Sequence, residues 1–256
     1  MKIGIITDIH ENYDMLTEAL RQAEMHKCDE MACLGDIVGF DRRYYRYGAK
    51  RSAKRCIEIV NSSFRWVVAG NHDLFAASRY PLHSDGFEYP DNWFRMNPLE
   101  RKLVSGGKVW CYEGDEMNDL GDSEIAYLES LPEYIITSEP GIPCLFSHYV
   151  FPDVTGSTTL YVERKRHLKH LWEFMETNSL KYSFTGHSHE LFAGFAYRKN
   201  SAFSRAIHNI PGSSFKLGHE MLMTVLPALT GERGRTGFTI LDSISMKLNI
   251  IKVGTV

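Results

Sequence analysis

The sequence predicts a layered α/β domain, and three observations support this prediction. Short apolar runs rich in β-branched residues recur along the 256 residues. Each run ends in polar or glycine-containing residues, as strands commonly do. Helical patterns separate the early runs, and alternation of strands and helices is typical of folds in which helices cover a sheet. We therefore expect residues 1–256 to form a single α/β domain.

The expected elements can be placed from the pattern. Helices are expected over 13–26, where Asn12 is a candidate N-cap, and over 50–60, 123–131 and 162–177. Residues 78–121 show no clear pattern, so we expect an insert or cap there. Single strands are expected over 2–7, 30–34, 66–69, 143–146, 182–185 and 206–210, and a hairpin joins 237–241 to 247–253.

Composition excludes several classes of protein. A net charge of −3 argues against a general nucleic-acid or membrane-surface binder. Five cysteines without a C-x-x-C pair fit neither a zinc finger nor a disulfide framework, which favours reduced thiols in a cytoplasmic protein. No apolar run approaches the roughly 20 residues that span a bilayer. The apolar N-terminal run is short and leads directly into Asp8, so we interpret it as a buried strand.

Side chains able to bind metals follow five of the expected strands. Because α/β folds build their sites from the loops at strand ends, these side chains should meet. Carboxylates, imidazoles and amide oxygens are ligands that manganese, iron and zinc accept. Seven ligands exceed the need of one metal ion but suit two ions that share a carboxylate. The seven are Asp8, His10, Asp36, Asn71, His148, His187 and His189.

The order of these motifs resembles that of the calcineurin-like metallophosphoesterases. Five motifs carry the resemblance and extend from residue 8 to residue 189. Each motif is weak alone, but five in this order, each after a β-like run, are specific. They are Asp8-Ile9-His10, Gly35-Asp36, Gly70-Asn71-His72-Asp73, the single His148 and Gly186-His187-Ser188-His189.

The resemblance implies a four-layer α/β/β/α sandwich with two divalent metal ions at the carboxyl edge of the sheet. Asp36 would bridge the two ions. His72 would face the phosphate without binding metal, and Asp73 would orient it. The implied ligands are Asp8, His10, Asp36 and His189 for the first ion, and Asp36, Asn71, His148 and His187 for the second.

Among family branches, the motifs look closest to the small bacterial phosphoesterases. That branch opens with D-I-H-G-N, whereas this chain has Glu11 in place of the glycine. It also has Phe40 in place of a tyrosine and Ile210 in place of an asparagine. A carboxylate beside the first ion would add a ligand, alter metal choice or narrow the opening for substrate.

The resemblance implies a metal-dependent phosphoesterase, with a diesterase on a small or nucleotide substrate as the leading reading. Arg42 and Arg43 are candidates to clamp phosphate, against the alternative of a solvated loop. Asn12 is a candidate phosphate contact, against the alternative of a helix cap.

Other functions remain open at this stage. They are a monoesterase or protein phosphatase, a nuclease and a binding scaffold on the same fold. The arginine that follows G-N-H in eukaryotic-type protein phosphatases is absent, since Asp73 stands there. The acidic charge argues against a nuclease, and the complete ligand set argues against a scaffold.

Overall fold

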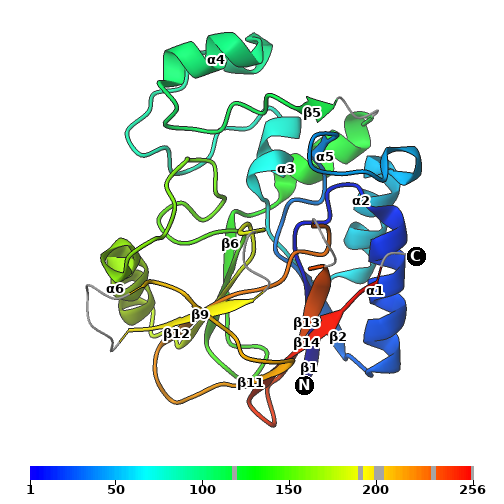
Figure 1. Ribbon diagram of the computed structural model, residues 1–256, viewed down its shortest axis with the longest axis vertical. Helices are drawn as coiled ribbons and strands as arrows, with labels where there is room; N and C mark the ends of the chain where they lie inside the picture. Colours follow the sequence, from blue (N-terminus) through cyan, green and yellow to red (C-terminus); the bar gives the residue numbers. More distant parts are fainter. Residues whose placement is uncertain (117–119, 190–192, 199–204, 232–234, 255–256) are drawn as a thin grey trace.

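The computed structural model describes residues 1–116, 120–189, 193–198, 205–231 and 235–254 (Figure 1). Two six-stranded sheets form its centre. The first sheet has the order β11 (Ser214–Lys216), β14 (Lys247–Lys252), β13 (Gly237–Asp242), β1 (Lys2–Ile6), β2 (Glu30–Cys33) and β4 (Trp66–Val67). The second has the order β10 (His208–Asn209), β9 (Gly194–Tyr197), β12 (Leu222–Val225), β8 (Tyr182–Thr185), β7 (Cys144–Ser147) and β6 (Tyr134–Thr137).

Helices cover the outer faces of the sheets. The α-helices are α1 (Tyr13–Met25), α2 (Ala53–Ser63), α3 (Asn71–Ala76), α4 (Pro98–Ser105), α5 (Asp122–Ser130) and α6 (Lys169–Thr177). Short 3₁₀ turns are η1 (Gly48–Lys50), η2 (Trp93–Arg95) and η3 (Lys165–Leu168). A separate two-stranded ribbon pairs β3 (Phe40–Asp41) with β5 (Asp115–Glu116).

Three apolar clusters hold the layers together. One packs α1 and α2 on the first sheet, with Leu16 and Val60 fully buried. A second lies between the two sheets, where Ile5 meets rings such as Phe146. A third packs α6, through Leu171, on the second sheet. Figure 1 shows α6 on one side of the strands and α1 with α2 on the other, an arrangement consistent with the expected α/β/β/α layering.

The direction of the strands explains why the motifs meet. Strand β1 pairs parallel with β2, and β2 pairs parallel with β4. In the second sheet, β7, β8 and β12 are also parallel. Parallel neighbours present their carboxyl ends at the same edge, where ligands usually bind. The five motifs follow β1, β2, β4, β7 and β8, and therefore share that edge.

Most expected elements occur close to their predicted bounds, with differences that have physical causes. The second helix begins at Ala53 because Ser52 caps it and accepts a hydrogen bond from the backbone N–H of Arg55. The helix expected from residue 162 begins at Lys169, after the turn η3. Helix α3 and strands β3, β6, β9, β11 and β12 were not predicted. The run at 206–210 forms only the short strand β10.

The segment expected as an insert, residues 78–121, contains η2, α4 and β5, while its residues 117–119 lie outside the described part. Helix α4 begins at the capping residue Asn97, whose side chain and that of Glu100 satisfy each other's backbone N–H groups. It ends at Gly106, whose φ of 57° is the left-handed conformation that glycine favours at helix ends. In the described part of the chain, no helix has both the length and the apolarity needed to cross a membrane.

The packing of α1 predicts a contrast between two positions on that helix. Leu16 is fully buried, whereas Met25 is 67% exposed. We expect Leu16→Ala to lower the free energy of unfolding by about 2–5 kcal/mol, because it removes buried methyl groups and leaves a cavity. Met25→Ala, the control, should change it by less than about 0.5 kcal/mol. Urea denaturation measures both, and equal effects would contradict the packing described here.

Candidate metal centre

The carboxylates of the first two motifs form the floor of the site. Asp8 and Asp36 are each only 1% exposed. Nε2 of His189 lies 3.1 Å from Oδ1 of Asp8, and Nε2 of His148 lies 3.1 Å from Oδ2 of Asp36. Nε2 of His10 lies 3.9 Å from Asp8 and 3.8 Å from Asp36, between the two carboxylates.

Backbone conformation at the strand ends turns these side chains toward one another. Asp8, His10, Asp36 and His187 all have positive φ, between 48° and 64°. This left-handed conformation is unfavourable for residues with a side chain and is often found at functional sites. Hydrogen bonds hold it in place, among them those from the backbone N–H of Asp8 to Gly35 and of His10 to Asp36, each 3.0 Å long.

Two glycines allow the motif loops to approach closely. A Cβ on Gly70 would overlap the Asp36 carboxylate, and one on Gly186 would overlap the Thr7 side chain. The glycine that opens each motif is therefore required for packing between loops. It brings the following Asn71 or His187 up to the carboxylates.

Backbone carbonyls fix which nitrogen of two histidines faces the centre. Nδ1 of His10 lies 2.7 Å from the carbonyl oxygen of Gly39, and Nδ1 of His148 lies 2.7 Å from that of Leu34. Because a carbonyl oxygen can only accept, each Nδ1 must carry the proton. The neutral form of each ring therefore presents the lone pair of Nε2 to the centre. Metal-binding histidines are commonly oriented in this way.

The site consequently brings several acceptor atoms close together, and two of its buried oxygens lack a hydrogen-bond donor among the described residues. Nε2 of His10 lies 3.2 Å from Nε2 of His189, and Nε2 of His148 lies 3.1 Å from Nδ1 of His187. Asp8 Oδ1 and Asn71 Oδ1 are buried, and no described residue hydrogen-bonds to either. Such a cluster of lone pairs is costly without a cation. Divalent metals that accept nitrogen and oxygen ligands fit it.

Asp36 has a distinct position because it touches two groups of ligands. Its Oδ1 accepts a 3.0 Å hydrogen bond from the backbone N–H of His72. Its other carboxylate oxygen, Oδ2, faces both His148 and His10. Among the described residues, three groups have ligand atoms close enough together to hold a metal ion: Asp8, His10 and His189; Asp36, His148 and His187; and His10, Asp36 and His72.

Burial and neighbouring charges favour the metal-binding forms of Asp36, His10 and His187, whereas against the effect of burial the Asp36 carboxylate raises the pKa of His148 to about 9. Burial opposes ionisation of Asp36, but His148 and His72 hold its pKa well below the ordinary value. Burial lowers the pKa of His10 to about 4 and that of His187 to about 3. Those two imidazoles are therefore neutral near pH 7, with lone pairs free to bind.

Comparison with known proteins decides the family. A family model described as calcineurin-like phosphoesterase matches residues 1–191. This chain belongs to the calcineurin-like phosphoesterases. The match covers the five motifs and both halves of the centre described above.

Individual relatives of this calcineurin-like chain are distant. An uncharacterised protein of Methanocaldococcus jannaschii is 27% identical over 169 residues, which are 62% of this chain and 58% of that protein. The fold is similar to that of a metallophosphoesterase from Sphaerobacter thermophilus, with a TM-score of 0.67, 20% identity and coverage of 99% and 88% of the two chains. A hypothetical protein from Pyrococcus horikoshii is also similar, with a TM-score of 0.59, 16% identity and coverage of 100% and 88%.

Asp73, expected to orient His72, has a different set of contacts in this calcineurin-like site. Its Oδ1 accepts from the backbone N–H groups of Ile37 and Val38, and its Oδ2 accepts from that of Gly70. Asp73 thus ties two motif loops together and caps α3. The carboxylate hydrogen-bonded to His72 is instead Asp115, whose Oδ2 lies 2.7 Å from Nδ1. Asp115 is not among the site residues that the sequence predicts.

The candidate substrate residues have structural partners. Asn12 caps α1 by accepting from the backbone N–H of Met15, in line with the capping alternative. Arg42 forms an ion pair of 2.6 Å with Glu116. Arg43 likewise pairs with Asp41. A phosphate contact for these three residues stays a prediction.

Glu11 turns to the neighbouring loop instead of adding a ligand to either metal-binding group. It is 1% exposed, and its Oε1 accepts from the backbone N–H of Gly39 at 3.2 Å. Its Oε2 lies 3.8 Å from Arg51. Its φ of 66° explains why a glycine suits this position in the branch that the opening motif resembles.

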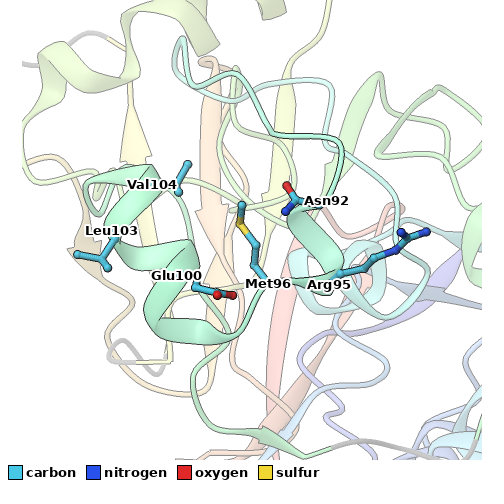
Figure 2. Close-up of a pocket in the computed structure, with 6 residues that line it drawn as sticks. All are labelled: Asn92, Arg95, Met96, Glu100, Leu103 and Val104. Atoms are coloured by element: carbon cyan, nitrogen blue, oxygen red, sulfur yellow. The ribbon is translucent and has the colours of Figure 1, made fainter.

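A hollow of about 440 Å³ lies elsewhere, between η2 and α4 (Figure 2). None of the residues lining it belongs to the five motifs, and the lining has no cluster of metal-binding groups. It is therefore separate from the metal centre. The lining residues are Asn92, Arg95, Met96, Glu100, Leu103 and Val104.

The shared position of Asp36 leads to a prediction about metal content. We expect Asp36→Asn to lose both metal ions, because Oδ2 faces both ligand groups. His189→Ala, the comparison variant, should lose one ion because its ring contacts only the Asp8 group. Elemental analysis of the purified proteins gives the stoichiometry. Full occupancy in Asp36→Asn would rule out a bridging role.

Proposed function

We propose that this chain hydrolyses phosphate esters with water at a dinuclear metal centre, and that its substrates are small or nucleotide phosphodiesters. The observation that carries the proposal is the arrangement of Asp36 between two groups of buried ligands. A single metal ion would leave one of these groups without a cation. The metal ions are divalent and of the manganese, iron or zinc type.

Each proposed ion has four ligands from this chain. The first ion takes Asp8, His10, Asp36 and His189, and the second takes Asp36, Asn71, His148 and His187. The distances among the first set and the unpartnered oxygen of Asn71 support these assignments. Two ions bound there would activate a water molecule and neutralise charge on the phosphate oxygens.

In this proposal, His72 protonates the leaving group. Its ring nitrogens lie within reach of the centre, close to His10 and Asp36, yet about one-fifth of the side chain is exposed. The bond to Asp115 requires a proton on Nδ1, because a carboxylate accepts. Burial opposes its charge, but Asp115 and Asp36 raise the pKa of His72 to about 10. The protonated ring can donate from Nε2 to a departing oxygen.

The charges around the centre favour a diester over a monoester. A monoester dianion carries one more negative charge than a diester. The arginines beside the β3–β5 ribbon are already engaged: Arg42 by Glu116, Arg43 by Asp41, and Arg51 by Glu116 at 3.3 Å. They therefore offer little compensation for the extra charge.

Two alternatives remain as outcomes to be tested. One is a phosphomonoesterase or protein phosphatase that uses the same centre. The other is a scaffold that binds metal and a partner without turnover. The complete ligand set and the presence of His72 favour catalysis over the scaffold.

The function is tested with paired chromogenic substrates, a phosphodiester and a phosphomonoester of the same phenol. We expect the metal-loaded protein to hydrolyse the diester faster, and a chelator to abolish turnover until metal is restored. Faster hydrolysis of the monoester would show that the protein is a phosphomonoesterase and not a phosphodiesterase. Absence of turnover with both ions bound would favour the scaffold.

The role of His72 predicts a loss of rate without a loss of metal. We expect His72→Ala to lower kcat by about 10²–10⁴-fold, the usual range for removal of a general acid. Metal content should stay at the level of the unmodified protein because His72 is not a ligand. His167→Ala, which removes a ring with no place in the site, serves as a control. An unchanged kcat in His72→Ala would refute the proposed role of His72 as a general acid.

A further inference from the structure

One segment of the insert returns to the metal centre. This segment, residues 112–116, ends in β5. Strand β5 pairs antiparallel with β3, which follows the Gly35-Asp36 motif. Figure 1 shows β5 lying next to α3, the helix that begins with Asn71 and His72. In this register Asp115 lies opposite Asp41, and its carboxylate reaches His72 across 43 positions of sequence.

The contact to His72 is specific to one carboxylate oxygen. Oδ2 of Asp115 lies 2.7 Å from Nδ1 of His72, a short distance typical of charge-assisted hydrogen bonds. The Asp115 side chain is 15% exposed, so water only partly competes for it. The bond determines the tautomer of the neutral ring and the direction in which Nε2 points.

A second set of contacts holds Asp115 in place. Its neighbour Glu116 pairs with Arg42 at 2.6 Å and with Arg51 at 3.3 Å. Arg51 also approaches Glu11, which accepts from the backbone N–H of Gly39. The ribbon is therefore tied to the loops of the first two motifs.

Tyr112 fastens the same segment to the other side of the histidine. Its hydroxyl donates a 3.1 Å hydrogen bond to the carbonyl oxygen of Asn71. Its ring stands edge-on to that of His72, with centroids 5.3 Å apart, and stacks on Phe75 at 4.0 Å. His72 is thus enclosed by the insert on two sides.

We propose that Asp115 is the positioning residue for His72, and that the insert is therefore part of the catalytic apparatus as well as a cover. This inference rests on the proposed function, because it gives His72 its orientation in that reaction. Asp115 hydrogen-bonds to His72 and, among the described residues, forms no hydrogen bond or ion pair with the seven proposed metal ligands. It acts by holding Nδ1 so that Nε2 faces the phosphate.

The variants Asp115→Asn and Asp115→Glu test this role, and Glu113→Gln is the matched control. Glu113 is a carboxylate of the same segment that pairs with Lys102 and Arg43 instead of with His72. We expect Asp115→Asn to lower kcat about 10–100-fold, since its amide can present the wrong hydrogen-bonding partner to Nδ1. KM should change less than about threefold and metal content should stay constant. Asp115→Glu should recover part of kcat, and Glu113→Gln should retain all of it.

A double variant separates positioning from a general structural effect. In a His72→Ala background, Asp115→Asn should cause no further loss, because the group it positions is gone. An equal loss in both backgrounds, or a loss confined to metal content or KM, would overturn the proposal. Thermal unfolding of each variant shows whether a loss of kcat reflects unfolding.

A readout without turnover distinguishes this proposal from the proposed function. In the zinc-loaded protein, nuclear magnetic resonance should show a hydrogen-bonded Nδ1–H of His72 that shifts in Asp115→Asn and stays in Glu113→Gln. An unmodified protein without esterase activity would refute the proposed function, while this signal would still report on the contact. Active enzyme whose kcat and signal survive Asp115→Asn would refute the positioning role alone.

Discussion

The structure depends on the concentration of hydrogen-bond acceptors around Asp8 and Asp36. Two buried carboxylates face histidine nitrogens at 3.1–3.9 Å, in a place from which water is largely excluded. The carbonyls of Gly39 and Leu34 point the lone pairs of two rings inward. Left-handed residues at the strand ends hold this arrangement at a cost in backbone energy that the surrounding sheets must offset. A divalent cation bound there would remove the main electrostatic conflict, and metal binding would then be coupled to folding.

The sequence predicted the α/β fold and the meeting of the candidate metal ligands because both follow from strong local signals. Buried parallel strands read as apolar runs, and a residue with chemical function directly after such a run lies at the edge of the sheet. His148 was found in this way although it is a single histidine. Strands β9 and β12 were missed because this signal is absent from them. Neither is followed by a motif, and short apolar stretches are ambiguous without one.

The partner of His72 could not be found in the same way. Asp73 is adjacent in sequence, but consecutive residues on a helix point in directions about 100° apart, so His72 and Asp73 face different surroundings. Asp115 lies in a strand of two residues, too short to produce any periodicity. Its role depends on the pairing of β5 with β3, which is a property of the tertiary structure. A sequence holds no local trace of such a pairing.

The ribbon formed by β3 and β5 holds a part of the site that the central sheets do not hold. The candidate metal ligands are fixed by the strands of the central sheets, whereas the bond between His72 and Asp115 closes a loop of 43 residues. From its length alone, such closure costs about 3 kcal/mol of chain entropy. This loss of entropy must be offset by other contacts of the segment. They are the aromatic stack of Phe75 on Tyr112 and the ion pairs of Glu116. On this proposal, a shortened insert in this chain would leave the candidate metal ligands in place but take away the carboxylate partner of His72, so that a complete set of motifs would not amount to a complete active site.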